Sequence, residues 1–244
     1  AQFGIDVRLP NMLYATVRAN PRLGGKMNSF DGSAAQSAKG VQQVVDLGDA
    51  VAVVADNTWR AFQAANLLTF DWGQAPYPPT TDAIFKSIAA SFAGPENDQP
   101  LNIGDSSQAL ANAEQVISVE YRAPFLAHST MEPMNAVAHL HDGILEIWTG
   151  NQTPTVARQQ AADLAGLPLE QVKLHIQLLG GGFGRRLESE YILQAVKLAI
   201  ALKGQPVKMT WTRPEDMQHD FYRPAAIARA QGVMGADGVP SVVQ

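Results

Sequence analysis

The stretch Gln171–Leu202 decides how the chain is interpreted, and it reads QVKLHIQLL, then GGGFGRR, then LESEYILQAVKLAIAL. In the first part, apolar and polar residues alternate from Val172 to Leu178, which predicts a half-buried strand. In the last part, apolar residues cover most of a helical surface from Tyr191 to Ile200, which predicts a deeply packed helix. We therefore expect a strand, a glycine-rich turn and a buried helix in direct succession.

The turn Gly180–Gly184 has a glycine at every position except Phe183. Such a turn permits positive φ angles and lets a ligand lie against the backbone. Its N–H groups and those of the following helix start favour an anion, which indicates a phosphate-bearing cofactor. Tight packing alone is the alternative interpretation. An ordinary nucleotide site is disfavoured, because no Lys-Ser/Thr pair follows the glycines and Leu187 stands where the third glycine of G-x-G-x-x-G would fall.

Composition limits the class of protein. The chain has 244 residues, enough for one large or two smaller domains, and its 46% hydrophobic and 17% charged residues are ordinary for a globular protein. A net charge of −5 disfavours a broad nucleic-acid surface, and no apolar run is long enough to predict a membrane span. The absence of cysteine excludes disulfides and cysteine-ligated Fe–S clusters within this chain.

The order of elements predicts an α+β fold. Residues 1–72 read as a compact mixed α+β unit, residues 73–104 as a proline- and glycine-punctuated connection, and residues 105–244 as a second, incomplete α+β domain. The chain starts at Ala1 rather than Met and stops inside a hairpin strand, so we expect a piece of a longer polypeptide. The compartment stays open between the bacterial periplasm and cytoplasm.

Two histidines flank a predicted hairpin turn with Asp-Gly chemistry, and they are His139 and His141. Histidine is a common metal ligand, but a metal site needs further ligands. Because the sequence near the turn offers no additional Cys or His, we interpret both as exposed turn residues.

Four motifs then occur in a consistent order. They are HSTMEPMNAVA at 128–138, WTGNQTPTVARQQAADLAGLP at 148–168, LLGGGFGRRLESE at 178–190 and TRPEDMQHDFYRP at 212–224. This series resembles the molybdopterin-binding large subunit of the xanthine dehydrogenase/aldehyde oxidase family, and is most similar to its isoquinoline 1-oxidoreductase beta-subunit branch. The resemblance covers nearly the whole chain and implies an α/β-hammerhead-like domain over residues 1–72 and the N-terminal part of the molybdenum-cofactor-binding domain over 105–244.

The resemblance also implies roles for particular residues. Backbone amides of the glycine turn would bind the pyranopterin, at Gly181, Gly182, Phe183 and Gly184, and Gln152 would approach the apical ligand of the metal. A cap of the following helix is the alternative for Gln152. The residues expected beside the substrate, or supporting those that touch it, are His128, Glu132, Arg186 and Glu188. Glu132 could accept from backbone N–H groups and hold the cofactor loop, or be a buried structural carboxylate.

Two departures from the family pattern narrow the implied activity. Glu188 is shifted by one position from the glutamate that contacts substrate in xanthine-oxidising members, which disfavours a purine. The family's catalytic glutamate, the general base, lies in the far C-terminal half and has no counterpart in this chain. We therefore expect no catalytic residue here and no activity from this piece alone.

The implied protein is a molybdenum hydroxylase that oxidises an aldehyde or N-heteroaromatic compound with water-derived oxygen. Its cofactor would be molybdopterin, in the cytosine dinucleotide form, with molybdenum. Its partners would be the C-terminal half of the large subunit and an iron–sulfur small subunit carrying 2Fe-2S clusters, since this chain has no cysteine. Two alternatives stay open: a nucleotide-binding enzyme that uses Gly180–Gly184 as a phosphate cradle, and a non-catalytic binding or assembly module.

Overall fold

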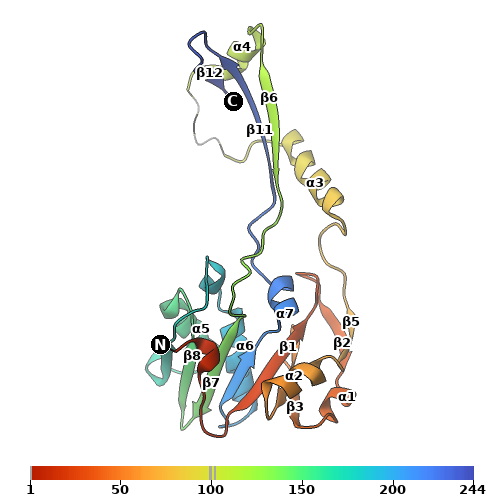
Figure 1. Ribbon diagram of the computed structural model, residues 1–244, viewed down its shortest axis with the longest axis vertical. Helices are drawn as coiled ribbons and strands as arrows, with labels where there is room; N and C mark the ends of the chain where they lie inside the picture. Colours follow the sequence, from red (N-terminus) through yellow and green to blue (C-terminus); the bar gives the residue numbers. More distant parts are fainter. Residues whose placement is uncertain (1, 99–100, 102) are drawn as a thin grey trace. The chain divides into compact units, whose positions relative to one another are not determined.

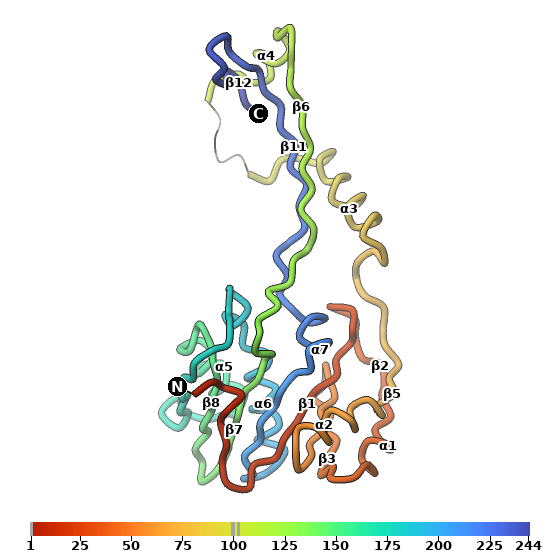
Figure 2. The backbone as a smooth tube through the Cα atoms, viewed as in Figure 1, coloured from red at the N-terminus to blue at the C-terminus, as the bar shows by residue number. Residues whose placement is uncertain are grey.

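The chain forms two compact units that each combine separate stretches of sequence. The computed structural model describes residues 2–98, 101 and 103–244 (Figure 1, Figure 2). The first unit contains the described residues up to Pro76 together with Ala127–Phe221, and the second contains those of Tyr77–Leu126 together with Tyr222–Gln244. Figure 2 follows the chain from red at the N-terminus to blue at the C-terminus, and each unit contains colours from both halves of the bar.

A seven-stranded mixed sheet forms the centre of the first unit. Its strand order is β3-β4-β1-β10-β7-β8-β9. In chain order the strands are β1 Leu13–Ala19, β3 Val41–Asp46, β4 Ala50–Ala55, β7 Asn135–His141, β8 Ile144–Thr149, β9 Val172–Ile176 and β10 Val207–Thr210. β1 pairs parallel with β10, and β8 pairs parallel with β9, while the other neighbours are antiparallel. The sheet therefore joins strands from residues 1–72 to strands from beyond residue 105.

Helices pack on both faces of this sheet. Two helices, α5 Pro154–Ala165 and α6 Glu190–Ala201, pack on one face together with buried side chains such as Ile147 and Leu198. On the other face, α1 Ser33–Gln36 and α2 Thr58–Ala65 pack over Val51 and Val53. β4 is buried at every position, as its uninterrupted apolar sequence predicts for a strand between two layers.

Local sequence signals account for where several helices begin and end. Asn57 accepts from the N–H of Arg60 and caps α2, while Pro154 opens α5. α5 ends at Gly166, whose φ of 65° lies in the left-handed region that glycine adopts readily. A short helix, α7 Arg213–Gln218, begins after Thr212, which accepts from the N–H of Glu215. The first unit also contains a two-stranded sheet of β2 Met27–Asp31 and β5 Thr69–Trp72.

The second unit is a three-stranded antiparallel sheet with two helices. Its strand order is β12-β11-β6, with β6 Ile117–Ala123, β11 Ala226–Met234 and β12 Pro240–Val243. β6 and β11 pair in register from Ala123 opposite Ala226 to Ile117 opposite Gly232, as Figure 1 shows for the two long strands. The helices are α3 Thr81–Ala90 and α4 Ser106–Ala111, and the side chain of Asp105 caps the latter.

The α+β class expected from the sequence is confirmed, as are the predicted hairpins β7–β8 and β11–β12. The division into residues 1–72, 73–104 and 105–244 stays a prediction, and three positions of the connection, 99, 100 and 102, lie outside the described residues. The predicted helix Tyr191–Ile200 lies within α6, but it does not follow the glycine turn directly, because a 3-10 turn at Arg185–Leu187 lies between them. Among the described helices, none has the length and apolar character needed to cross a membrane.

Candidate functional site

The glycine turn follows β9 and has a backbone that ordinary residues rarely adopt. The φ angles of Gly181 and Gly184 are 103° and 104°, and Phe183 has a φ of 57° in the left-handed region. The N–H of Arg185 donates to the carbonyl of Gly182 over 2.8 Å, which closes the turn on itself. Because α6 starts further along the chain, the N-terminus of that helix does not contribute to the turn. Any ligand of this turn would meet its own amides.

Glu132 holds the first residue of the turn from behind. The N–H of Gly180 donates to Oε2 of Glu132 over 2.8 Å, and the N–H of Glu132 donates to the carbonyl of Gly180 over 3.0 Å. Oε1 of Glu132 accepts from the N–H of Ile5 at 2.9 Å and from the amide of Asn135 at 3.0 Å. Glu132 therefore accepts from the backbone N–H groups of Gly180 and Ile5. It ties the turn to the N-terminal segment.

Arg186 lies fully buried beneath the same turn. Its Nη2 reaches Oε2 of Glu132 at 2.9 Å and also donates to the carbonyl of Glu132. Its Nε donates to the carbonyl of Gly181 over 2.9 Å. A buried charge needs a partner and satisfied hydrogen bonds, and Arg186 has both. The ion pair therefore braces two positions of the turn at once.

Gln152 contacts the other end of the turn. Its side-chain Oε1 accepts from the backbone N–H groups of Gly184 and Arg186, each at 3.2 Å. The backbone N–H of Gln152 donates to the carbonyl of Arg186 over 2.9 Å. A Cβ built on Gly182 would lie 2.7 Å from Oε1 of Gln152, so only glycine fits there without displacing the amide. These contacts fix the carbonyl side of the Gln152 amide, and the donor side, its NH₂, stays available to a ligand.

Three consecutive amides of the turn have no acceptor in the part of the chain that the structure describes. They belong to Gly181, Gly182 and Phe183. Successive free N–H groups in a turn with left-handed residues form an anion-binding concavity. The side chain of Phe183 is 77% exposed beside them. This combination of free donors, absent side chains and an exposed ring suits a flat ligand that carries negative charge.

His128 reaches the turn from a neighbouring loop. Its Nε2 lies 3.5 Å from the position that a Cβ on Gly184 would occupy, and its Nδ1 lies 2.8 Å from Oδ1 of Asp220. The backbone N–H of His128 also donates to Oδ2 of Asp220. Arg185 is buried and pairs with Asp220, with 3.3 Å between Nε and Oδ1, and with Glu190. Asp220 therefore positions both His128 and the residue that follows Gly184.

Burial raises the pKa of two groups at the start of α6. It raises the pKa of Glu190 above its usual range, with the nearby Arg185 acting in the opposite direction. It also raises the pKa of Tyr191, whose hydroxyl donates to the carbonyl of Gly150 over 2.8 Å. Tyr191 therefore stays neutral at ordinary pH and supports the strand end that leads to Gln152.

The structure brings most of the sequence-derived site residues together around the turn. Gln152, Glu132 and Arg186 contact it directly through hydrogen bonds, and His128 lies against Gly184. Glu188 is exposed and lies beyond the 3-10 turn. Sequence reasoning missed the supporting residues Arg185 and Asp220. The Arg-Arg pair directly after the glycines was the available signal, because two adjacent buried charges require two acidic partners elsewhere.

The residues of this site lie within a stretch that matches a known protein family. Residues 92–242 match the model of the molybdopterin cofactor-binding domain. The chain belongs to this family. The match includes Gln152, the glycine turn and the loop that carries Glu132, so the residues gathered around the turn all lie inside a cofactor-binding domain.

Two relatives match nearly the whole chain. One is the "Membrane-bound aldehyde dehydrogenase (pyrroloquinoline-quinone)" of Gluconacetobacter polyoxogenes, 31% identical over 95% of this chain and 31% of its own length. The other is the isoquinoline 1-oxidoreductase subunit beta of Brevundimonas diminuta, 30% identical over 96% of this chain and 31% of its own length. The chain therefore spans about a third of the length of these relatives.

The fold is also found in solved structures. Quinoline 2-oxidoreductase from Pseudomonas putida 86 matches with a TM-score of 0.77 at 20% identity, over 99% of this chain and 36% of the matched chain. The Cu,Mo-CO dehydrogenase matches with a TM-score of 0.76 at 22% identity, over 99% of this chain and 37% of the matched chain. At these identities the likeness shows a shared fold.

Proposed function

We propose that this chain is the N-terminal part of a molybdenum hydroxylase large subunit and supplies one wall of its cofactor site. The observation that carries this proposal is the row of free amides at Gly181, Gly182 and Phe183 beside the Gln152 amide. The membership of the chain in the molybdopterin cofactor-binding family supports it. Backbone donors with no side chain in the way suit a flat cofactor with a phosphate group.

The residues of the turn fit such a cofactor. Gly181, Gly182, Phe183 and Gly184 would hold the pterin through backbone contacts, and Gln152 would direct its NH₂ group at the metal centre. The acceptor contacts of Oε1 to two backbone N–H groups fix the orientation of this amide. Glu132 and Arg186 would act from behind the turn by holding its shape, and His128 would support Gly184. Glu188 is exposed, and we infer that it would contact the substrate.

When bound, the molybdenum cofactor supplies the two-electron acceptor and the site where water-derived oxygen is transferred. For an aldehyde the balanced reaction converts the aldehyde and one water into a carboxylic acid, two protons and two electrons. This chain would contribute orientation, because the turn amides and Gln152 would hold the cofactor in place. The general base of the family has no counterpart here, so the remainder of the large subunit would supply it.

The names of the relatives support the substrate class. They include an aldehyde oxidoreductase molybdenum-binding subunit from Escherichia coli, the isoquinoline oxidoreductase subunit and a nicotinate dehydrogenase subunit from Pseudomonas putida. We infer an aldehyde or an N-heteroaromatic substrate. We also infer the cytosine dinucleotide form of molybdopterin and an iron–sulfur partner subunit with 2Fe-2S clusters, to which the electrons pass, since this chain has no cysteine.

One experiment tests the cofactor directly. The full-length protein is expressed with its partner subunit, and molybdenum, extracted pterin and pyrroloquinoline quinone are measured per chain. We expect about one molybdenum and one pterin per large subunit, and a large loss of both in Gln152→Ala and in Gly182→Val. The Glu188→Gln variant is the control, because the exposed side chain of Glu188 makes no hydrogen bond to the turn amides or to Gln152.

Three other results would each contradict the proposal. If the protein contains pyrroloquinoline quinone and no molybdenum, its cofactor is the one in the name of the Gluconacetobacter relative. Saturable ATP or NAD binding that Gly182→Val abolishes would establish a nucleotide enzyme. A protein without any of these cofactors would be a binding or assembly module.

A further inference from the structure

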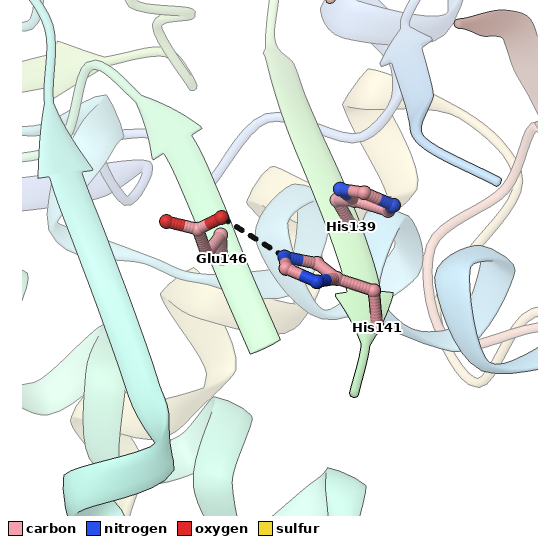
Figure 3. Close-up of side chains that lie close together, drawn as sticks. All are labelled: His139, His141 and Glu146. Carbon is pink, nitrogen blue, oxygen red and sulfur yellow. Dashed lines mark hydrogen bonds and ion pairs between the residues drawn. The ribbon is translucent and has the colours of Figure 1, made fainter. Parts of the chain in front are cut away.

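A second group of side chains that can bind a ligand lies at the end of strand β7 away from the glycine turn. His139 and His141 are two residues apart on β7, so their side chains share one face of the sheet. In the register of the hairpin, Glu146 of β8 lies directly opposite His139. Figure 3 shows the two histidine rings and the Glu146 carboxylate close together, with the contact between His141 and Glu146 dashed. His141 lies six residues along β7 from Asn135, roughly 20 Å at the rise of a strand.

The ligand atoms of these three side chains lie slightly further apart than those of an occupied metal site. One ligand atom from each of His139, His141 and Glu146 lies within 4.8 Å of the other two. With bonds of about 2.0–2.1 Å, two ligands of one Zn²⁺ ion lie at most about 4.2 Å apart. Small rotations of the three half-buried side chains would close this difference. The 3.1 Å between Nε2 of His141 and Oε2 of Glu146 already lies in the range for neighbouring ligands.

The hydrogen-bond roles around the two histidines call for a positive charge. Nδ1 of His141 faces Oδ2 of Asp142 at 3.3 Å and Nε2 faces Glu146, so both ring nitrogens point at carboxylate oxygens. A neutral imidazole has a single N–H, so one of these contacts requires a second proton or a cation. The carbonyl of Gly204 accepts from Nε2 of His139 over 3.0 Å, which leaves the lone pair of Nδ1 available.

Neighbouring residues hold Glu146 in position. Nε2 of His175 on β9 lies 3.1 Å from Oε1 of Glu146, and the ring of His175 stacks on Trp148 with 4.7 Å between centroids. Each of the three side chains thus has a further hydrogen-bond partner. Gly204 contacts His139, Asp142 contacts His141 and His175 contacts Glu146. Metal-binding histidines regularly donate their second N–H to a carbonyl or a carboxylate in this way.

We propose that His139, His141 and Glu146 bind a divalent transition-metal ion of the Zn²⁺ class, with water at the fourth position. Two imidazoles and one carboxylate suit Zn²⁺ better than Ca²⁺ or Mg²⁺, which prefer oxygen ligands alone. The ion joins β7 to β8 and, through Gly204, to the loop that leads into β10. Its role is structural, and it goes beyond the proposed cofactor function of the glycine turn.

Calorimetric titration with ZnCl₂ tests this site on the purified protein after treatment with EDTA. We expect saturable binding of about one ion per chain and a rise in Tm of several degrees at saturation. Cobalt in place of zinc should give the intense visible absorption of a four-coordinate site. His139→Ala and His141→Ala should each weaken binding by more than about tenfold. Glu146→Gln keeps the shape of the side chain and should do the same.

The matched control is Glu170→Gln, the same change at an exposed glutamate elsewhere in the unit, and it should leave Zn²⁺ affinity unchanged. Circular dichroism without metal establishes that each variant is folded. Absence of saturable binding would overturn the proposal. Equal affinity in Glu146→Gln, or equal weakening in Glu170→Gln, would overturn it as well, because the ion would then bind other groups or surface charge in general.

Discussion

The two sides of the glycine turn differ in almost every physical respect. Behind it, Glu132 and Arg186 are buried, charged and fully engaged in hydrogen bonds to the turn and to each other. In front, Gln152 and Phe183 are exposed, and three amides have no acceptor among the described residues. The turn is therefore held from one side, and its other side presents unsatisfied donors to a ligand.

The largest effect is expected behind the turn. Glu132→Ala should lower the free energy of unfolding by about 3–5 kcal/mol, because it leaves the buried Arg186 without its partner and frees the N–H of Gly180. Urea denaturation measures the change. The double variant Glu132→Leu/Arg186→Met should cost less than the sum of the two single changes, since no buried charge is left unpaired. A loss below about 1 kcal/mol in Glu132→Ala would show that the pair does not hold the turn.

Two glycines of the turn offer a matched pair of tests. A Cβ on Gly180 would lie 2.4 Å from Cβ of the buried Glu132, which cannot move freely, so Gly180→Ala should cost about 1–3 kcal/mol of stability. A Cβ on Gly182 would meet the end of the exposed Gln152 side chain, which can rotate away. Gly182→Ala should therefore cost less stability but lower cofactor content. If both variants lower Tm by the same amount, the two sides of the turn do not differ in how tightly they are packed.

The pH dependence of stability tests the group next to Glu132. Burial lowers the pKa of Lys208 to about 8, with a smaller effect of Arg8, and its Nζ donates to the carbonyl of Ile5. The unfolded chain then binds more protons between pH about 8 and the ordinary lysine value of 10.5, so the contribution of Lys208 to stability rises with pH in this window. The difference in unfolding free energy between wild type and Lys208→Met should shift in favour of the wild type from about pH 7.5 to 9.5. A constant difference would contradict the lowered pKa.

The smallest effect on stability is expected in front of the turn. Gln152→Ala removes an exposed side chain and the acceptor for the N–H groups of Gly184 and Arg186, and the free energy of unfolding should fall by about 0.5–1 kcal/mol. The same variant should lose cofactor from the full-length protein, which separates binding from folding. If Gln152→Ala unfolds as readily as Glu132→Ala, Gln152 is a structural cap of α5, the alternative considered for it.

Much of the fold was predictable because its signals are local. The Asp142-Gly143 turn joins β7 and β8, and both residues have the positive φ that such a turn requires. Pro154 and Gly166 mark the ends of α5, as their backbone preferences predict. The helix predicted at Tyr191–Ile200 lies within α6, but no local signal indicated the 3-10 turn that separates it from the glycines. Both arginines of that turn pair with buried acidic residues that lie far away in the sequence, Asp220 and Glu132.

The sequence alone indicates most of the strands and helices, the exceptional turn at Gly180–Gly184 and the motifs of the family. These follow from backbone preferences and apolar periodicity within a few residues. The contact of Arg186 with Glu132 beneath the turn, and the cluster of Glu146 with His139 and His141, become apparent in the folded chain. Such contacts join residues on different strands and loops, so they depend on sheet register and packing, which no local pattern specifies.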